Sequence, residues 1–204
     1  MTTTSGIAHY IKDIGRGKEG ARSLTRAQAT DLFGLVLDGA VSDLEIGAFC
    51  LAMRIKGETR DELMGFIDAA EARIDHHALQ AASGLASKNG IVVIPSYNGA
   101  RKLPLLTPLL ALLLAREGLS VLVHGIDEGL KAVSGVQRVT SSEIFNRLDI
   151  ANSGVAYCSI AQLAPSLKKL LDVRKVVGLR NSAHSVVKLI NPYRGNSNVH
   201  SVLV

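Results

Sequence analysis

Three helix-start signals follow one another in the first third of this chain, and they constrain its fold more than any other feature. Each is a capping box, in which a Ser or Thr side chain accepts from a backbone N–H three residues ahead and a Glu or Gln there reaches back. The pairs are Thr25 with Gln28, Ser42 with Glu45, and Thr59 with Glu62. Apolar residues recur at helical spacing after the first two boxes and stop at Gly39 and near Gly57. Residues 1–78 are therefore expected to form a compact antiparallel helical bundle.

The composition changes after this bundle. A small, polar, glycine-bearing stretch predicts a linker over residues 79–90. Short β-branched runs then alternate with helical segments, and three of them read as strands: Ile91–Ile94, Val121–His124 and Val155–Cys158. Thr107 and Pro108 are expected as the N-cap and first residue of the helix after the first strand. This alternation favours βαβ units, so residues 91–204 are predicted to form an α/β domain with a mainly parallel sheet.

The last residues, "VHSVLV", begin a further strand. The chain ends inside that strand, so we expect the C-terminal part of the α/β domain to be missing.

The overall composition is that of a soluble globular protein, with 204 residues, 47% hydrophobic and 20% charged. The most apolar run, "LPLLTPLLALLLA", is broken by prolines and shorter than the roughly 20 residues that span a bilayer. The N-terminus lacks the apolar core of a signal peptide. Cys50 and Cys158 lie far apart in apolar contexts, which predicts neither a disulfide nor a metal site. A cytoplasmic location and no membrane partner are expected.

One motif matches a ligand-binding pattern but lacks the structural context that the pattern requires. "GRGKEG", residues 15–20, matches the G-x-G-x-x-G pattern of dinucleotide-binding loops. That pattern has meaning only between a strand and a helix, and here it follows the helical stretch "IAHYIKDI". We interpret it as a glycine-rich turn between the first two helices.

Longer motifs resemble a known family. The stretch "LDGAVSDLEIGAFCLAMRIKGET", within residues 24–70, resembles the N-terminal domain of the anthranilate phosphoribosyltransferases. The resemblance continues through "REGLSVLVHG", "DVRKVVGLRN" and "KLINP", so it covers nearly the whole chain. "VIPSYNGARK" and "GLRNSAHSVVKL" are similar to the family's non-tryptophan branch, which is associated with nucleic-acid binding. The resemblance implies a homodimer with a helical domain and an α/β domain of the nucleoside phosphorylase and phosphoribosyltransferase type.

The resemblance places the family's diphosphate-binding loop on residues 95–100, where it looks degraded. Pro95 and Tyr97 stand where glycines let the backbone approach the diphosphate, and a proline carries no N–H donor. The four residues that we interpret as a degenerate phosphate loop are Ser96, Tyr97, Asn98 and Gly99. Gly99 replaces the loop's aspartate.

Few other functional positions of the family survive. Leu105 stands in place of an asparagine that would contact phosphate. The residual family positions are His124 and Gly125, from a K-H-G-N segment, and Arg174, which matches the arginine that meets the anthranilate carboxylate. The family's metal-binding acidic pair would lie beyond the last residue. We therefore expect no catalytic residues, no metal and no cofactor; the alternative is Mg²⁺ with a phosphoribosyl diphosphate donor.

Cations concentrate in one late segment. Residues 165–194 hold seven cations against one acid, Asp172, within a chain whose net charge is +5. Lys168, Lys169 and Lys175 lie within helical reach of one another, which predicts a basic stripe. Arg101 and Lys102 follow the degenerate phosphate loop at a helix start, where positive charge opposes the macrodipole, so they favour a functional role. The candidate nucleic-acid-binding residues are Lys168, Lys169, Arg174, Lys175, Arg180, Lys188, Arg101 and Lys102.

Three functions remain open. The first is a non-catalytic homologue that binds DNA or RNA largely independently of sequence, since phosphate contacts dominate such binding and few aromatics (Tyr97, Tyr157, Tyr193) are available for stacking. The second is a phosphoribosyltransferase or phosphorylase with an altered substrate. The third is a helical dimerisation module. An ordinary solvated basic face would also account for the charges.

Overall fold

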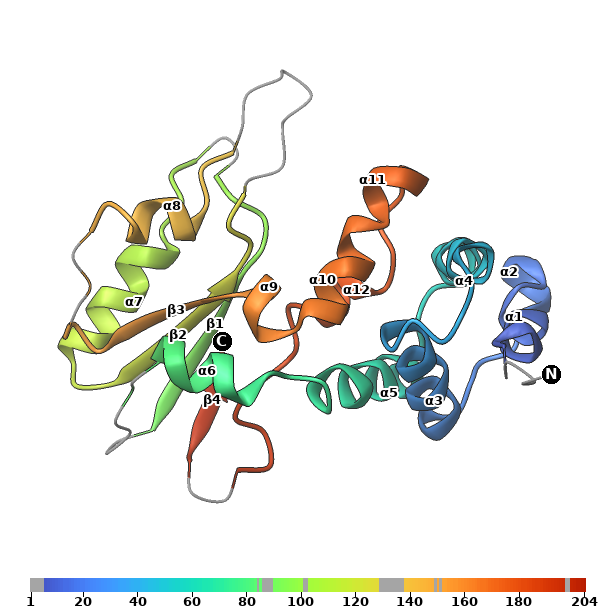
Figure 1. Ribbon diagram of the computed structural model, residues 1–204, viewed down its shortest axis with the longest axis horizontal. Coiled ribbons are helices and arrows are strands. Elements are labelled where there is room, and N and C mark those ends of the chain that lie inside the picture. The colour runs from blue at the N-terminus through green and yellow to red at the C-terminus, as the bar shows by residue number, and fades with distance from the viewer. Residues whose placement is uncertain are drawn as a thin grey trace. The chain divides into compact units, whose positions relative to one another are not determined.

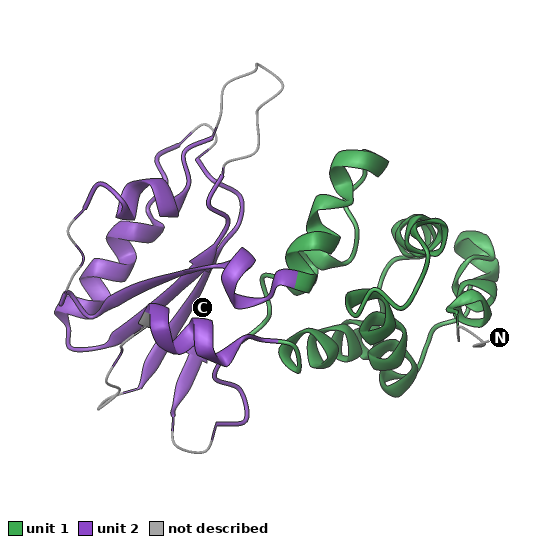
Figure 2. Cartoon of the chain, viewed as in Figure 1, with its two compact units in different colours: residues 1–73, 166–190 green, residues 74–165, 191–204 purple. Residues whose placement is uncertain are grey.

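The structure is a computed structural model that describes residues 6–83, 85, 90–100, 103–128, 138–148, 150, 152–196 and 199–204. The chain forms two compact units that interleave along the sequence (Figure 2). Unit 1 combines residues 1–73 with 166–190, and unit 2 combines residues 74–165 with 191–204.

These units differ from the contiguous domains 1–78 and 91–204 that the composition suggests. Residues 166–190 pack with the N-terminal helices, so the basic segment belongs mostly to the helical unit. Residues 79–83, placed in a linker by their composition, continue a helix that begins at His76.

Unit 1 consists of helices, which confirms the expectation for the first third of the chain. Their bounds are α1 Ala8–Ile14, α2 Gly17–Gly20, α3 Arg26–Leu37, α4 Asp43–Lys56, α5 Arg60–Glu71, α10 Pro165–Asp172, α11 Arg174–Val177 and α12 Ala183–Val186 (Figure 1). All three expected capping boxes start their helices, at α3, α4 and α5. The G-x-G-x-x-G motif lies at α2, between helices, and no strand precedes it in the described part of the chain.

The core of the helical unit is built on three phenylalanines. Phe33, Phe49 and Phe66 come from α3, α4 and α5, and their ring centroids lie 4.7–6.2 Å apart. Helices α3 and α5 approach closely at Gly65, where an added Cβ would lie 2.4 Å from the carbonyl oxygen of Arg26. Only glycine permits that approach, so this position fixes how the two helices pack.

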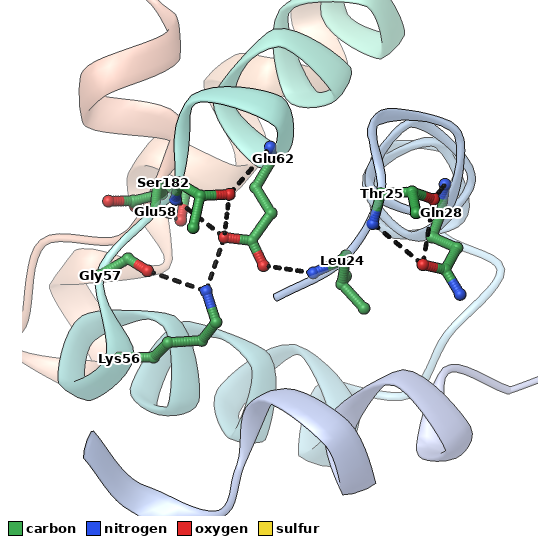
Figure 3. Close-up of polar contacts among 9 residues, drawn as sticks. Leu24, Thr25, Gln28, Lys56, Gly57, Glu58, Glu62 and Ser182 are labelled. Atoms are coloured by element: carbon green, nitrogen blue, oxygen red, sulfur yellow. Dashed lines mark hydrogen bonds and ion pairs between the residues drawn. The ribbon is translucent and has the colours of Figure 1, made fainter. Parts of the chain in front are cut away.

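A buried carboxylate joins the segments of this unit (Figure 3). Glu62 is fully buried, and one oxygen accepts from the Leu24 N–H at 2.9 Å. Its other oxygen accepts from the Thr59 N–H at 2.8 Å and from Lys56 Nζ at 2.6 Å. Burial raises the pKa of Glu62, but these donors outweigh burial and hold the pKa below its usual value. The carboxylate therefore ties the lead-in to α3, the end of α4 and the start of α5.

Replacing this carboxylate should destabilise the helical unit. We expect Glu62→Gln to cost about 3–5 kcal/mol of unfolding free energy at neutral pH, because Lys56 would stay buried without its counter-charge. Since the folded-state pKa lies below the unfolded one, the stabilisation is complete above about pH 4.3 and is lost as the pH falls further. Urea unfolding at pH 7 and pH 3 would measure both effects.

Glu45→Gln is the matched control, since Glu45 closes the same capping box on α4. None of the ion pairs of the described residues involves it. Equal losses for the two variants would mean that the Lys56 pair adds nothing to an ordinary helix cap.

Unit 2 is a parallel sheet covered by helices, as the sequence predicts. The strands are β1 Ile91–Ser96, β2 Ser120–Gly125, β3 Val155–Ser159 and β4 Ser201–Leu203, in the order β3-β2-β1-β4. The helices are α6 His76–Ser83, α7 Thr107–Arg116, α8 Ser141–Phe145 and α9 Ile160–Leu163. Every recorded strand pair is parallel, with Ile94 beside Val123 and Val123 beside Tyr157. Helices α7 and α8 cover one face, while α6 and α9 lie on the other (Figure 1).

One local expectation for this unit is wrong. Thr107 is the first residue of α7 and not its cap; the cap position is Leu106, which makes no side-chain capping bond. Pro108 still lies in the first turn, where its missing N–H costs no helical hydrogen bond.

Candidate functional site

The carboxyl ends of parallel strands are where open α/β sheets bind ligands, and here the degenerate phosphate loop follows β1. Its polar groups bond to neighbouring protein groups. The Ser96 hydroxyl lies 2.7 Å from the Ser141 hydroxyl, and the Tyr97 hydroxyl lies 2.6 Å from Nδ1 of His124. Asn98 is exposed, and Gly99 takes φ +63°. Tyr97 has therefore filled the space beside the strand ends with its own ring.

His124 is held neutral by this arrangement. It is fully buried, and burial lowers its pKa to about 3. Burial also raises the pKa of Tyr97, so the phenol keeps its proton and forms a hydrogen bond with Nδ1. No group among the described residues bonds to Nε2. A histidine in this state holds the end of β2 in place and does not exchange protons near neutral pH.

Gly125 is retained for packing. An added Cβ there would lie 2.2 Å from the Ser96 carbonyl oxygen, so β1 and β2 could not approach as they do. The next acid, Asp127, accepts from the hydroxyls of Ser142 (3.2 Å) and Ser159, which joins the ends of β2 and β3 to α8.

The described residues here do not fit a diphosphate and its metal. Ser96, Tyr97, His124 and Asp127 are engaged with one another or with nearby serines, and Pro95 offers no N–H. No group of three His, Cys, Asp or Glu side chains within the described ranges is placed to hold a metal ion.

The structure corrects one of the three tyrosines that the sequence suggested for base stacking. Tyr97 is only 8% exposed, because its ring packs into the site and reaches His124. Tyr157 and Tyr193 are partly buried with their hydroxyls inside. Tyr97 therefore offers no open ring face for base stacking, while stacking on Tyr157 and Tyr193 stays a prediction.

The buried histidine predicts a pH dependence of stability. The folded-state pKa of His124 is about 3 and the ordinary value is 6.5, so the unfolded chain takes up the proton first. Stability should fall by about 1.4 kcal/mol per pH unit below pH 6.5 from this residue. His124→Gln keeps a polar acceptor for Tyr97 and should remove that slope in urea unfolding between pH 6.5 and 5.

Tyr97→Phe serves as the control, since it removes the hydroxyl but leaves the histidine titratable and buried. It should lower stability by about 1–3 kcal/mol at pH 7 while keeping the slope. Parallel pH profiles for the wild type and His124→Gln would contradict the neutral, buried state.

A second site lies in unit 1. A pocket of about 460 Å³ forms between the α4–α5 connection and the segment around α12. Its lining is Met53, Arg54, Gly57, Glu58, Arg180, Asn181, Ser182, His184, Ser185, Lys188 and Leu189. Three permanent cations therefore face one carboxylate. The Ser182 hydroxyl donates to Glu58 Oε1 at 2.6 Å and joins the two walls across 124 residues of sequence (Figure 3).

His184 adds a neutral ring to this pocket. Burial first, and then the nearby charges of Arg174, Arg180 and Lys188, lower its pKa to about 4. Its Nδ1 lies 3.2 Å from Oδ1 of Asn181, which already accepts from the Ala183 N–H. Since that oxygen only accepts, Nδ1 carries the proton and Nε2 is an acceptor.

Some of the residues predicted to bind nucleic acid lie at or near this pocket. Arg180 and Lys188 line it, and Arg174 lies near enough to lower the pKa of His184. Nη1 of Arg174 is buried, and no described group accepts a hydrogen bond from it. Lys169 is exposed on α10.

The basic stripe is partly neutralised. Lys168 and Lys175 both pair with Asp172, Lys175 at 3.0 Å, which holds the pKa of that carboxyl below its usual value despite burial. Residues 168 and 175 also lie on separate helices, α10 and α11, and not on one. Arg101 and Lys102 lie outside the described residues.

Sequence reasoning missed Arg54 and Glu58. They are far from the basic segment along the chain, and neither charge belongs to a run. The M-R-x-K-G-E-T motif could have pointed to them, since it contains both residues. It spans the turn between α4 and α5, where Gly57 takes φ +80°.

Comparison with known proteins agrees with this two-part architecture. Residues 8–73 match a family model described as "Glycosyl transferase family, helical bundle domain". An uncharacterized protein of Escherichia coli (strain K12), YbiB, is 40% identical over 196 residues, which cover 90% of this chain and 58% of that protein. The chain belongs to the anthranilate phosphoribosyltransferase-like family. An anthranilate phosphoribosyltransferase of Methylocella silvestris is 29% identical over 88% of this chain and 51% of its own length.

Solved structures share the fold. The anthranilate phosphoribosyltransferase of Thermus thermophilus superposes with a TM-score of 0.69 at 19% identity, over 95% of this chain and 57% of that one. The chain thus spans a little over half the length of the relatives it matches. No helix in the described part of the chain has both the length and the apolar character of a membrane span.

Proposed function

We propose that this protein is a non-catalytic member of its family that binds nucleic acid through the basic surface of the helical unit. The observation that carries the proposal is the pocket where Arg54, Arg180 and Lys188 meet, with Arg174 close by. Lys169 adds an exposed cation on α10, and Lys175 on α11 is exposed although it pairs with Asp172. Cations from separate parts of the sequence are brought together, which a merely solvated charge run does not require.

Such a surface would bind by phosphate contacts. Neutralised phosphates release counterions, so the affinity should fall steeply with salt and depend little on sequence. The supporting residues supply the needed donors: guanidinium groups for bidentate phosphate contacts, and the Ser185 hydroxyl beside them.

The alternative is a transferase or phosphorylase with an altered substrate. Relatives that share the fold are named anthranilate phosphoribosyltransferase. Against it stands the strand-end site, where Tyr97 and His124 bond to each other. Saturable, Mg²⁺-dependent release of diphosphate from a phosphoribosyl donor, weakened by Arg174→Ala, would support the enzyme and overturn our proposal.

The proposal includes a cytoplasmic homodimer. Helix α4 exposes Leu44, Leu51 and Ile55, whose spacing of seven and four residues places them on one face. That face would suit a second copy of the chain, and a dimer would join two basic surfaces. Sedimentation of the protein, with Leu51→Asp as the disrupted variant, tests this part.

Removing the pocket cations should weaken binding. We expect Arg180→Ala with Lys188→Ala to lower the affinity for a labelled mixed-sequence oligonucleotide by about tenfold or more and to reduce the salt slope by about 1–2. Both side chains are exposed, so the fold should survive. Fluorescence anisotropy at several salt concentrations measures both quantities.

Lys18→Ala with Lys12→Ala is the matched control, since these are exposed cations of unit 1 outside the pocket lining. It should change affinity little. Equal effects of the two double variants would reduce the binding to general net charge, and micromolar or weaker wild-type binding near physiological salt would remove the proposal.

A further inference from the structure

The basic pocket contains one feature that phosphate binding does not explain. Glu58 is the one acid among the described residues of its lining, which also include Arg54, Arg180 and Lys188. A carboxylate there repels every phosphate that approaches, so a surface that served only phosphates would bind better without it.

The carboxylate is also held in place. Ser182 is 1% exposed and donates its hydroxyl to Glu58 Oε1 at 2.6 Å. A carboxylate has about four lone-pair sites on its two oxygens, so this one bond leaves both oxygens able to accept again. Glu58 is exposed and lines the pocket, so its carboxylate is accessible to a ligand that enters it.

A fixed carboxylate surrounded by cations suits a ligand that has both negative charge and a pair of N–H donors. A nucleotide has both, and the volume of about 460 Å³ lies in the range of about 300–1,000 Å³ typical of small-molecule sites. Among the bases, guanine presents two adjacent donors, N1–H and the exocyclic amino group, on its Watson–Crick edge. Thymine and uracil place carbonyl oxygens on both sides of their single N–H, and these would repel the carboxylate.

We infer that the pocket holds one unpaired guanine nucleotide of a single strand, with Glu58 accepting from its Watson–Crick edge and the arginines holding adjacent phosphates. The inference rests on the proposed function and adds a local base preference to it. Ser182 is a positioning residue, since it orients the carboxylate. In a duplex the same edge is consumed by pairing, so the preference should be confined to single strands.

The test compares a thymidine 12-mer with the same strand carrying one central guanine. We expect the guanine strand to bind the wild type about tenfold more tightly. Glu58→Gln should abolish this difference and, by removing a negative charge, strengthen binding of the thymidine strand. Ser182→Ala should reduce the difference without changing thymidine binding.

Glu19→Gln is the control, because it removes one exposed carboxylate of the same unit away from the pocket. It should leave the guanine preference intact. A guanine strand annealed to its complement should lose the preference, and guanosine monophosphate should compete only weakly.

The outcomes separate the inference from the proposed function. Equal binding of both strands, with Glu58→Gln strengthening both alike, would overturn the guanine pocket while leaving phosphate-dominated binding standing. Binding of neither strand would overturn both. Guanosine monophosphate binding as tightly as the strand would identify a free nucleotide as the ligand and overturn the single-strand inference.

Discussion

The helical unit depends on one buried ion pair. Glu62 and Lys56 are almost inaccessible to water, so their charges must satisfy each other and the surrounding backbone donors. Because Glu62 also holds Leu24 and Thr59, the turn between α4 and α5 has a fixed position relative to the start of α3. That turn carries Glu58, and α4 carries Arg54 one turn earlier. The ion pair of Glu62 and Lys56 therefore positions the wall of the pocket that carries Arg54 and Glu58.

The two candidate sites show opposite uses of polar groups. At the strand ends of unit 2, Tyr97, His124 and Asp127 bond to the protein itself, and burial keeps the histidine neutral. In unit 1, Arg54, Lys188 and Glu58 are exposed and line a pocket. A site that binds a ligand must leave donors and acceptors available, so the basic pocket is the stronger candidate.

Packing fills the space at the loop after β1, which the sequence resemblance matched to the family's diphosphate-binding loop. Tyr97 supplies a ring beside β2 and a hydroxyl that bonds to Nδ1 of His124. Retention of Gly125 then needs no phosphate, since the approach of β1 and β2 already excludes a Cβ. Residues that match a family motif can thus persist for reasons of folding.

Sequence alone determined most of the local structure, although it misplaced the cap of α7. Capping boxes such as Thr59 with Glu62 act over three residues, and the β-branched runs that form β1, β2 and β3 follow a short period. Both patterns can therefore be predicted from the sequence. It also located the basic segment. Only the tertiary structure decided that residues 166–190 join the helical unit and that Glu58 meets Ser182. These contacts join residues far apart along the chain, and their energy depends on packing that no local pattern encodes.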